Sequence, residues 1–336
     1  MRDGVPIYPG SFEVISWAIA RAFANIALVK YWGKREGAEN LPATASISLA
    51  IDALKTVCKI ERLDSGQDEI FINGAMAVGA TSVRISKYLD FWRAAKLIDG
   101  HFLVTSENNF PTGAGLASSA SGFAALAVAL AAFSERKIAV KELSRLARVG
   151  SGSSARSITG GLSALPIGKN PSAKLMLDAE SVPFGMVVMT VESAPKKIPS
   201  GQGMEMSRNS SPYYNTWLKQ AQADYEAMTQ AIRTMDFAKI GEIAESNALV
   251  MHTCMIAGRP PLLYWSGKTI EIIKAVWKWR SEGLQVYFTV DAGPNVILIA
   301  RREDLNEVSR VAESMPGIQR IILGLPAGGS EILMRE

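Results

Sequence analysis

The strongest limit on the fold of this chain is a run of small residues, NFPTGAGLASSASGFAA. Pro111, Gly113 and Gly115 predict a tight loop directly ahead of a long alanine-rich helix. Backbone N–H groups of such a loop can approach a ligand, and the partial positive charge of a helix N-terminus favours an anion. Ser118 and Ser119 place hydroxyls in the first turn. The run indicates a phosphate-binding loop or, alternatively, a capped helix packed closely through its alanines. It is not a Walker A loop, because no Gly-Lys-Ser/Thr follows.

Composition narrows the class of protein. The 336 residues are 48% hydrophobic and carry a net charge of +4 without long basic runs, which suits an anionic small molecule better than nucleic acid. The few cysteines (Cys58, Cys254) and histidines (His101, His252) exclude a disulfide framework and an H-E-x-x-H zinc site. No signal-peptide core is apparent, and the longest apolar run, 123–133, is too short to span a membrane. We therefore expect a cytoplasmic protein without a membrane or nucleic-acid partner.

Strand and helix signals are mixed along the chain, without the regular alternation of a doubly wound sheet. Alternating or apolar runs predict strands at 24–31, 46–52, 56–63, 69–73, 102–106, 183–192, 285–290, 295–300 and, as the last strand, 319–324. Helical spacing predicts helices at 82–96, 116–133, 141–149, 212–235, 238–251 and 266–280. Residues 150–161 are small and polar and predict a loop or a helix start. The pattern predicts an α+β fold of two lobes, 1–182 and 183–336.

Three further segments carry groups suited to an anionic ligand. Lys30 ends an apolar strand in NIALVKYWGKR. Its ammonium group either faces a bound anion or extends to solvent while its aliphatic chain packs on apolar neighbours. Arg156, with Ser151 and Ser153 in GSGSSARSITGG, suits a carboxylate or phosphate, although a plain surface loop fits equally. Asp291 follows the apolar strand of VYFTVDAGPN and is either a base in a cleft or a turn aspartate bonded to its own loop.

Several segments together give the chain a resemblance to a known family. It resembles the mevalonate diphosphate decarboxylase family of the GHMP kinase superfamily in ANIALVKYWGKR, SENNFPTGAGLASSASGFAALA, LSRLARVGSGSSARSITGG, KKIPSGQGM, ESNALVMHTC, RPPLLYW and VDAGPN. These segments run from about residue 24 to 295. The glycine loop departs from the family's usual Pro-Thr-Ala-Ala-Gly at Gly113, and Gly201 stands where some bacterial members have arginine. The resemblance implies a GHMP kinase-type two-lobed fold with mixed and antiparallel sheets, an ATP-binding N-terminal lobe and an active-site cleft between the lobes.

The resemblance also implies an activity: ATP- and Mg²⁺-dependent decarboxylation of mevalonate 5-diphosphate to isopentenyl diphosphate, with transient phosphorylation of the C3 hydroxyl. A homodimer is expected because family members are usually homodimers. The alternatives are a mevalonate-type 3-kinase or a phosphomevalonate decarboxylase of the same superfamily. A more distant one is a non-catalytic nucleotide sensor, which the presence of Lys30, Arg156 and Asp291 disfavours.

The family's functional residues fall on matching positions of this chain. The implied catalytic group is Asp291, beside the C3 hydroxyl, with Lys30, Arg156 and Asn25. Residues implied to bind the substrate diphosphate are Tyr31, Lys34, Ser151, Ser153 and Ser200. Residues implied to bind ATP are Ser106, Asn108, Pro111, Gly113, Ala114, Gly115, Leu116, Ala117, Ser118 and Ser119, with Ser119 also at the magnesium ion.

Overall fold

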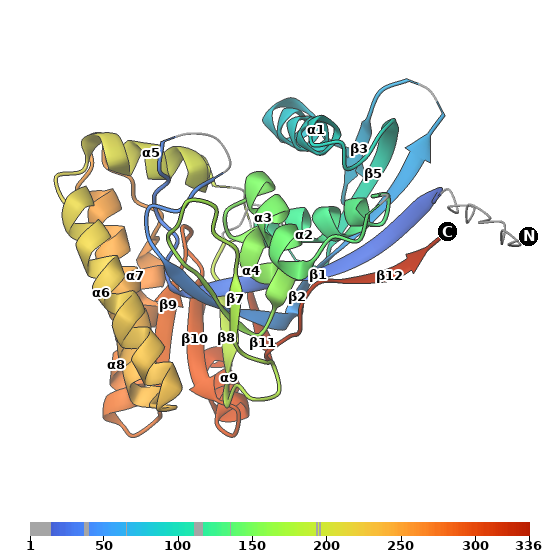
Figure 1. The fold of residues 1–336 in the computed structure, drawn as a ribbon. Helices are drawn as coiled ribbons and strands as arrows, with labels where there is room; N and C mark the ends of the chain where they lie inside the picture. Colours follow the sequence, from blue (N-terminus) through green and yellow to red (C-terminus); the bar gives the residue numbers. More distant parts are fainter. Residues whose placement is uncertain are drawn as a thin grey trace, which may run out of the picture.

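The structure, a computed structural model, describes residues 15–36, 40–64, 66–110, 117–134, 136–192, 194 and 196–336. Within these ranges the chain forms two sheets with helices packed around them (Figure 1). None of the described helices is long and apolar enough to cross a membrane. Mixed sheets and helices of this kind confirm the α+β prediction.

The first sheet holds the early strands of the chain. Its main path runs in the order β12 (Glu331–Arg335), β1 (Trp17–Val29), β2 (Ser46–Leu63), β5 (His101–Asn108), β3 (Glu69–Ile72) and β4 (Ala75–Met76). Beside it, β6 (Leu162–Leu165) pairs with β2 and with β7 (Lys174–Leu177). The two strands predicted at 46–52 and 56–63 are in fact the single strand β2, because it pairs with β1 along its length through a register shift between Phe23 and Asn25.

Helices of the first half cover this sheet. They are α1 (Gly79–Ala94), α2 (Ser118–Ala131), α3 (Val140–Gly150) and α4 (Ser154–Thr159). The alanine-rich α2 packs on β1 and β2, and its small side chains allow this close approach. Alanines also face it from the sheet, where Ala18, Ala20 and Ala22 are fully buried. The polar segment 150–161 contains the short helix α4, whose Ile158 packs into the same hydrophobic cluster as α2.

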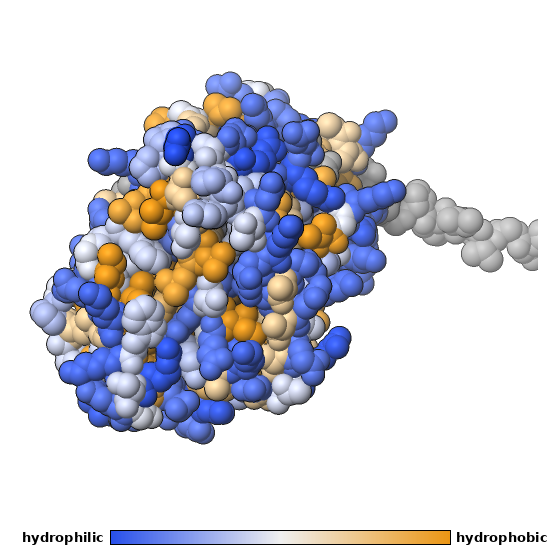
Figure 2. All heavy atoms as spheres, turned by 90° about the vertical axis from the view of Figure 1, so that its left-hand side faces the viewer, coloured by the Kyte–Doolittle hydropathy of each residue, from blue (hydrophilic) through white to orange (hydrophobic). Residues whose placement is uncertain are grey.

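The second sheet is antiparallel, in the order β11 (Arg320–Gly324), β8 (Phe184–Thr190), β10 (Val296–Arg301) and β9 (Val286–Val290). One face packs on α8 (Gly267–Ser281) and α9 (Leu305–Glu313). The other face joins β1, β2, α6 (Tyr214–Arg233) and α7 (Phe237–Ile256) in one hydrophobic cluster. Figure 2 shows that the side of the molecule on which α6 and α8 lie is covered mainly by hydrophilic residues, with apolar patches among them.

The chain contains elements that periodicity did not predict. They are β4, β6, β7, α5 (Ser200–Ser210), α9 and β12. The prediction that 319–324 is the last strand is wrong, because β12 follows it and pairs with β1 at the edge of the first sheet. This strand is short and largely exposed, so it lacks the alternation of buried positions that makes a strand recognisable. The end of the chain therefore completes the sheet that its beginning starts.

Candidate active site

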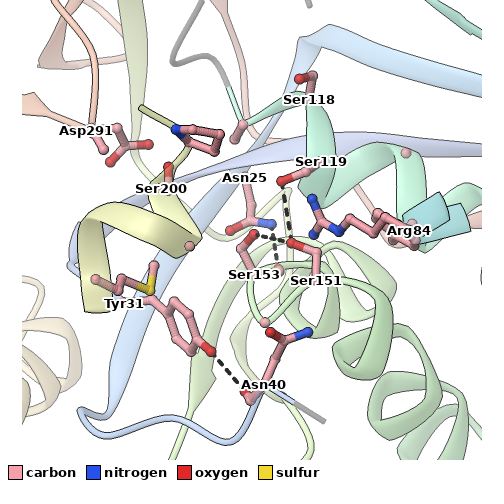
Figure 3. Close-up of a pocket in the computed structure, with 18 of the residues that line it drawn as sticks. Asn25, Tyr31, Asn40, Arg84, Ser118, Ser119, Ser151, Ser153, Ser200 and Asp291 are labelled. Carbon is pink, nitrogen blue, oxygen red and sulfur yellow. Dashed lines mark hydrogen bonds between the residues drawn. The ribbon is translucent and has the colours of Figure 1, made fainter. Parts of the chain in front are cut away.

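The predicted site residues that the structure describes line one cleft of about 640 Å³ (Figure 3). They come from both halves of the chain: Asn25, Lys30, Tyr31, Lys34, Ser106, Asn108, Ala117, Ser118, Ser119, Ser151, Ser153, Arg156, Ser200 and Asp291. The predicted residues Pro111, Gly113, Ala114, Gly115 and Leu116 lie outside the described residues. The sequence therefore pointed to positions that share one cavity, although they lie as far apart in the chain as Asn25 and Asp291.

A lysine and an aspartate form an ion pair in this cleft. Lys30 follows the last residue of β1, and Asp291 follows the last residue of β9. Lys30 Nζ lies 2.5 Å from Asp291 Oδ1 and donates a second hydrogen bond of 2.8 Å to the Ala27 carbonyl. The lysine is 2% exposed, whereas Asp291 is 20% exposed. Burial lowers the pKa of Lys30, and the Asp291 carboxylate opposes this effect. The result is a carboxylate that reaches the cleft while a buried cation supports its charge.

Arg156 lies in the same cleft as a buried cation with neutral partners. This α4 residue is 2% exposed. Its guanidinium donates to Ser48 Oγ at 2.6 Å, to Asn25 Oδ1 at 3.3 Å and to Ser46 Oγ. Burial lowers its pKa to about 10, with Asp291 opposing the shift, and no ion pair to it occurs among the described residues. Because a buried cation is costly without a counter-charge, this arrangement suits an anionic ligand group such as a carboxylate.

Hydroxyl groups line another part of the cleft, beside the N-terminus of α2. Ser119 Oγ lies 3.3 Å from Ser151 Oγ, which lies 3.4 Å from Ser153 Oγ (Figure 3). Ala117, just before the helix, has a positive φ of 56°, so the chain turns sharply into α2, whose N-terminal residues line the cleft. Hydroxyls and a helix N-terminus together suit phosphate oxygens.

Three further predicted residues, Tyr31, Lys34 and Ser200, line other parts of the cleft. Tyr31 donates from its hydroxyl to the Asn40 carbonyl at 2.8 Å, and burial raises its pKa. Burial also lowers the pKa of Lys34, and Arg84 adds to this effect. Ser200 is the first residue of α5. These groups add hydrogen-bond donors and positive charge around the same volume.

The structure adds residues that sequence reasoning missed. Lys196 lines the cleft and donates to the Ala292 carbonyl at 2.7 Å and to Ser200 Oγ at 2.8 Å. Burial lowers its pKa to about 8, with Asp291 opposing the shift. Arg84 on α1 also lines the cleft and donates to the Gly150 carbonyl at 2.7 Å. The Lys196–Lys197 pair was visible in the sequence, but nothing in the pattern shows which lysine faces inward. Arg84 lies among several other charged residues of α1, so nothing in the sequence singled it out.

The cleft has too few oxygen ligands to bind magnesium by itself, but it could bind a magnesium ion that is already coordinated by a nucleotide. Among the described residues, no group of three or more His, Cys, Asp or Glu side chains is placed to hold a metal ion. The cleft instead offers the hydroxyls of Ser118 and Ser119 beside a helix N-terminus. Magnesium keeps several waters and binds through one or two protein oxygens together with substrate phosphates, so this sparse donor set matches a nucleotide-borne ion.

Fold and cleft together define a class: a two-lobed GHMP kinase-type enzyme whose cleft is lined by the N-terminus of α2 and by the Lys30–Asp291 ion pair. Known proteins narrow this class to a family. The profile of the diphosphomevalonate decarboxylase-like N-terminal domain matches residues 22–176, and that of the mevalonate 5-diphosphate decarboxylase C-terminal domain matches residues 186–321. The chain belongs to the diphosphomevalonate decarboxylase family, as its sequence predicted.

Individual relatives agree with this membership. Diphosphomevalonate decarboxylase of Candida albicans is 33% identical over 301 residues, 84% of this chain and 83% of that protein. The solved mevalonate diphosphate decarboxylase of Staphylococcus aureus is 35% identical with a TM-score of 0.89, covering 96% of this chain and 99% of its own. A structure described as a complex with MVAPP, AMPPCP and magnesium is 33% identical with a TM-score of 0.87, over 95% and 99% of the two chains. These likenesses extend through both lobes.

Proposed function

We propose that the protein catalyses ATP-dependent decarboxylation of mevalonate 5-diphosphate to isopentenyl diphosphate, releasing ADP, phosphate and carbon dioxide. The observation that carries this proposal is the Lys30–Asp291 ion pair, which shares a cleft with the buried cation Arg156. The names of the relatives, and the ligands named for one of them, support the choice of substrates. ATP and magnesium belong to the same proposal.

Phosphorylation comes first in this mechanism, because a tertiary hydroxyl cannot leave as hydroxide at neutral pH. Asp291 orients the C3 hydroxyl and accepts its proton while the oxygen attacks the γ-phosphorus of ATP, and the bond to ADP breaks. Lys30 holds the Asp291 carboxylate in place through its hydrogen bond and stabilises the transferring phosphoryl group. Magnesium, when bound with ATP, neutralises phosphate charge, and Ser119 is the residue that would contact it. Positioning and electrostatics supply most of the rate in such a reaction.

Loss of phosphate and carbon dioxide follows. The C3–O bond breaks, the phosphate leaves with the bonding electrons, and C3 gains cationic character. The electrons of the bond to the carboxylate carbon then form the alkene, and carbon dioxide departs. Arg156 is suited to hold the substrate carboxylate through this step, because Asn25, Ser46 and Ser48 fix its guanidinium without neutralising it.

The substrate diphosphate fits the donors around the rest of the cleft. In this proposal it contacts Tyr31, Lys34, Ser151, Ser153 and Ser200, and the ATP phosphates and nucleoside lie against Ser106, Asn108 and the segment around Ala117, Ser118 and Ser119. Lys196 lies next to Ser200 and adds a charge that the sequence analysis did not include. Its ammonium is placed to balance phosphate charge between the two ligands.

The test is incubation of the purified protein with ATP, magnesium and mevalonate 5-diphosphate, with carbon dioxide and ADP counted separately. We expect the two products in equal amounts. ADP without carbon dioxide would instead identify a 3-kinase. Carbon dioxide formed only from the 5-monophosphate would identify a phosphomevalonate decarboxylase. The predicted homodimer and cytoplasmic location stay predictions, and sedimentation of the purified protein tests the first.

A further inference from the structure

Helix α7 lies behind the ion pair and contacts both of the strands that carry it. It packs against β1, which leads to Lys30, and against β9, which leads to Asp291. Its residue Glu245 already fixes β9, because it accepts the Phe288 N–H at 3.1 Å and pairs with Arg280. The same helix therefore offers a rigid support for both members of the pair.

Asn247 of α7 holds the backbone of Lys30. Its Oδ1 accepts the Lys30 N–H at 2.8 Å, and its Nδ2 donates to Asp224 Oδ2 at 2.8 Å. Asn247 is fully buried and Asp224 is 7% exposed. Because Asp224 can only accept when ionised, it fixes the amide so that the oxygen faces Lys30.

His252 of α7 holds the backbone of Asp291 from the other side. Its Nε2 lies 3.2 Å from the Asp291 carbonyl oxygen and 3.3 Å from that of Val290. Both oxygens are acceptors, so Nε2 carries the hydrogen and donates. The ring is fully buried and lies 4.5 Å from the Trp265 ring, centroid to centroid.

The neutral state of His252 suits this position. Burial lowers its pKa to about 3, and the nearby Lys30 charge adds to this effect, while the two carbonyls oppose it. Its Nδ1 has no hydrogen-bond partner among the described residues. A neutral donor can hold the turn without drawing the Asp291 carboxylate away from Lys30, which a second cation would do.

We propose that Asn247 and His252 are positioning residues, through which α7 sets the separation of Lys30 and Asp291. The proposal rests on the role of Asp291 proposed above. Neither residue lines the cleft, so each acts through the backbone it holds. Small displacements at a reacting centre can lower rates by roughly 100-fold, so the support has a measurable effect.

A pair of amide substitutions separates positioning from packing. In His252→Gln the side-chain nitrogen can reach the place of Nε2, whereas in His252→Asn it reaches only the place of Nδ1. We expect His252→Asn to lower kcat by roughly 10-fold or more with KM values for both substrates nearly unchanged, and His252→Gln to restore most of kcat. Cys254→Ala is the matched control, since it removes a fully buried side chain of the same helix that does not line the cleft. It should lower thermal stability and leave kcat intact.

Equal kcat values for the Gln and Asn variants would overturn the role of His252, and so would a wild-type kcat in His252→Asn. If His252→Asn does not fold, Asn247→Ala decides by the same split: lowered kcat with unchanged KM supports the proposal, and unchanged kcat overturns it. Asp291→Asn is measured alongside. If that variant stays active, the proposed role of Asp291 fails. If it is inactive while the α7 variants turn over normally, only the positioning proposal fails.

Discussion

The two ends of the cleft differ in the burial and the charge of their side chains. At one end, Lys30 and Arg156 are each 2% exposed, and their charges are fixed by hydrogen bonds within the protein. At the other end, Ser119 is exposed and Ser118 is half-buried, and both are neutral hydroxyls beside a helix N-terminus.

This difference separates two tasks. Charges that are buried and fixed before binding need no rearrangement during reaction, which is the arrangement that stabilises a transition state. Neutral donors at a solvent-facing end suit a ligand that brings its own charge and metal ion. We therefore expect substitutions at the charged end to reduce turnover and those at the hydroxyl end to weaken binding.

The largest effect is expected for Asp291→Asn. This change removes the group proposed to accept the C3 proton and leaves the Lys30 ammonium buried without its counter-ion. Turnover should fall by roughly 1,000-fold or more, whereas ATP binding should stay nearly intact. Carbon dioxide release measures turnover, and titration with a non-hydrolysable ATP analogue measures nucleotide binding. Retention of more than a small fraction of the wild-type rate would contradict the role of Asp291.

Arg156→Lys should have the next largest effect. Lysine keeps the charge but loses the planar fork that Ser46, Ser48 and Asn25 hold. A hydrogen bond to a charged group contributes about 1.5–3 kcal/mol, so kcat/KM for the diphosphate substrate should fall roughly 10- to 100-fold. Steady-state kinetics at saturating ATP measure it. If instead only the KM for ATP increased, Arg156 would contribute to nucleotide binding and this prediction would be wrong.

The pH dependence of kcat/KM should show whether the charge of Lys196 contributes to activity. Burial lowers the pKa of this lysine to about 8, so its ammonium is present below that pH and is lost as the pH rises through it. We expect kcat/KM to fall above about pH 8, approaching tenfold per unit, because this parameter follows the free enzyme. In Lys196→Arg the group stays charged, so this alkaline fall should move to higher pH. An unchanged profile in the variant would assign the fall to another group.

The smallest effect is expected for Ser119→Ala. It removes a single neutral hydroxyl, and such hydrogen bonds contribute about 0.5–1.5 kcal/mol, so the KM for magnesium-ATP should rise roughly two- to tenfold with little change in kcat. Ser281→Ala, on an exposed residue of α8 away from the cleft, serves as the control. If Ser119→Ala reduced kcat as strongly as Asp291→Asn, the division between the two ends would not hold.

Much of the fold could be predicted from the pattern of apolar residues in the sequence. The strands β8 and β10 and the helix α6 were predicted to within a few residues, because each strand is a short continuous apolar run and the apolar positions of α6 repeat at helical spacing. The helix α5, SGQGMEMSRNS, has no such repeat. It is held instead by tertiary packing: a Cβ added at Gly203 would come within 2.8 Å of the Tyr264 hydroxyl oxygen and 3.0 Å of the Trp32 ring.

The site was less accessible to local reasoning than the fold. Taken alone, Lys30 and Asp291 each allowed an ordinary structural explanation, and they lie 261 positions apart in the chain. Spacing carries no information over such a separation, so the resemblance to a family was what joined them. Lys196 could not be predicted as a site residue even with the resemblance, since only its contacts with Tyr264 and Ala292 distinguish it from Lys197.

The closure of the first sheet by β12 has a consequence during synthesis. The ribosome makes this strand after every other described element, yet it covers the outer edge of β1, the first of them. Until residues 331–335 emerge, the segment Ala18–Arg21 of β1 lacks this partner and presents unpaired backbone groups to its surroundings. The interval between translation of the first and last strands is therefore the period in which a growing chain is most exposed to strand pairing with a neighbouring copy.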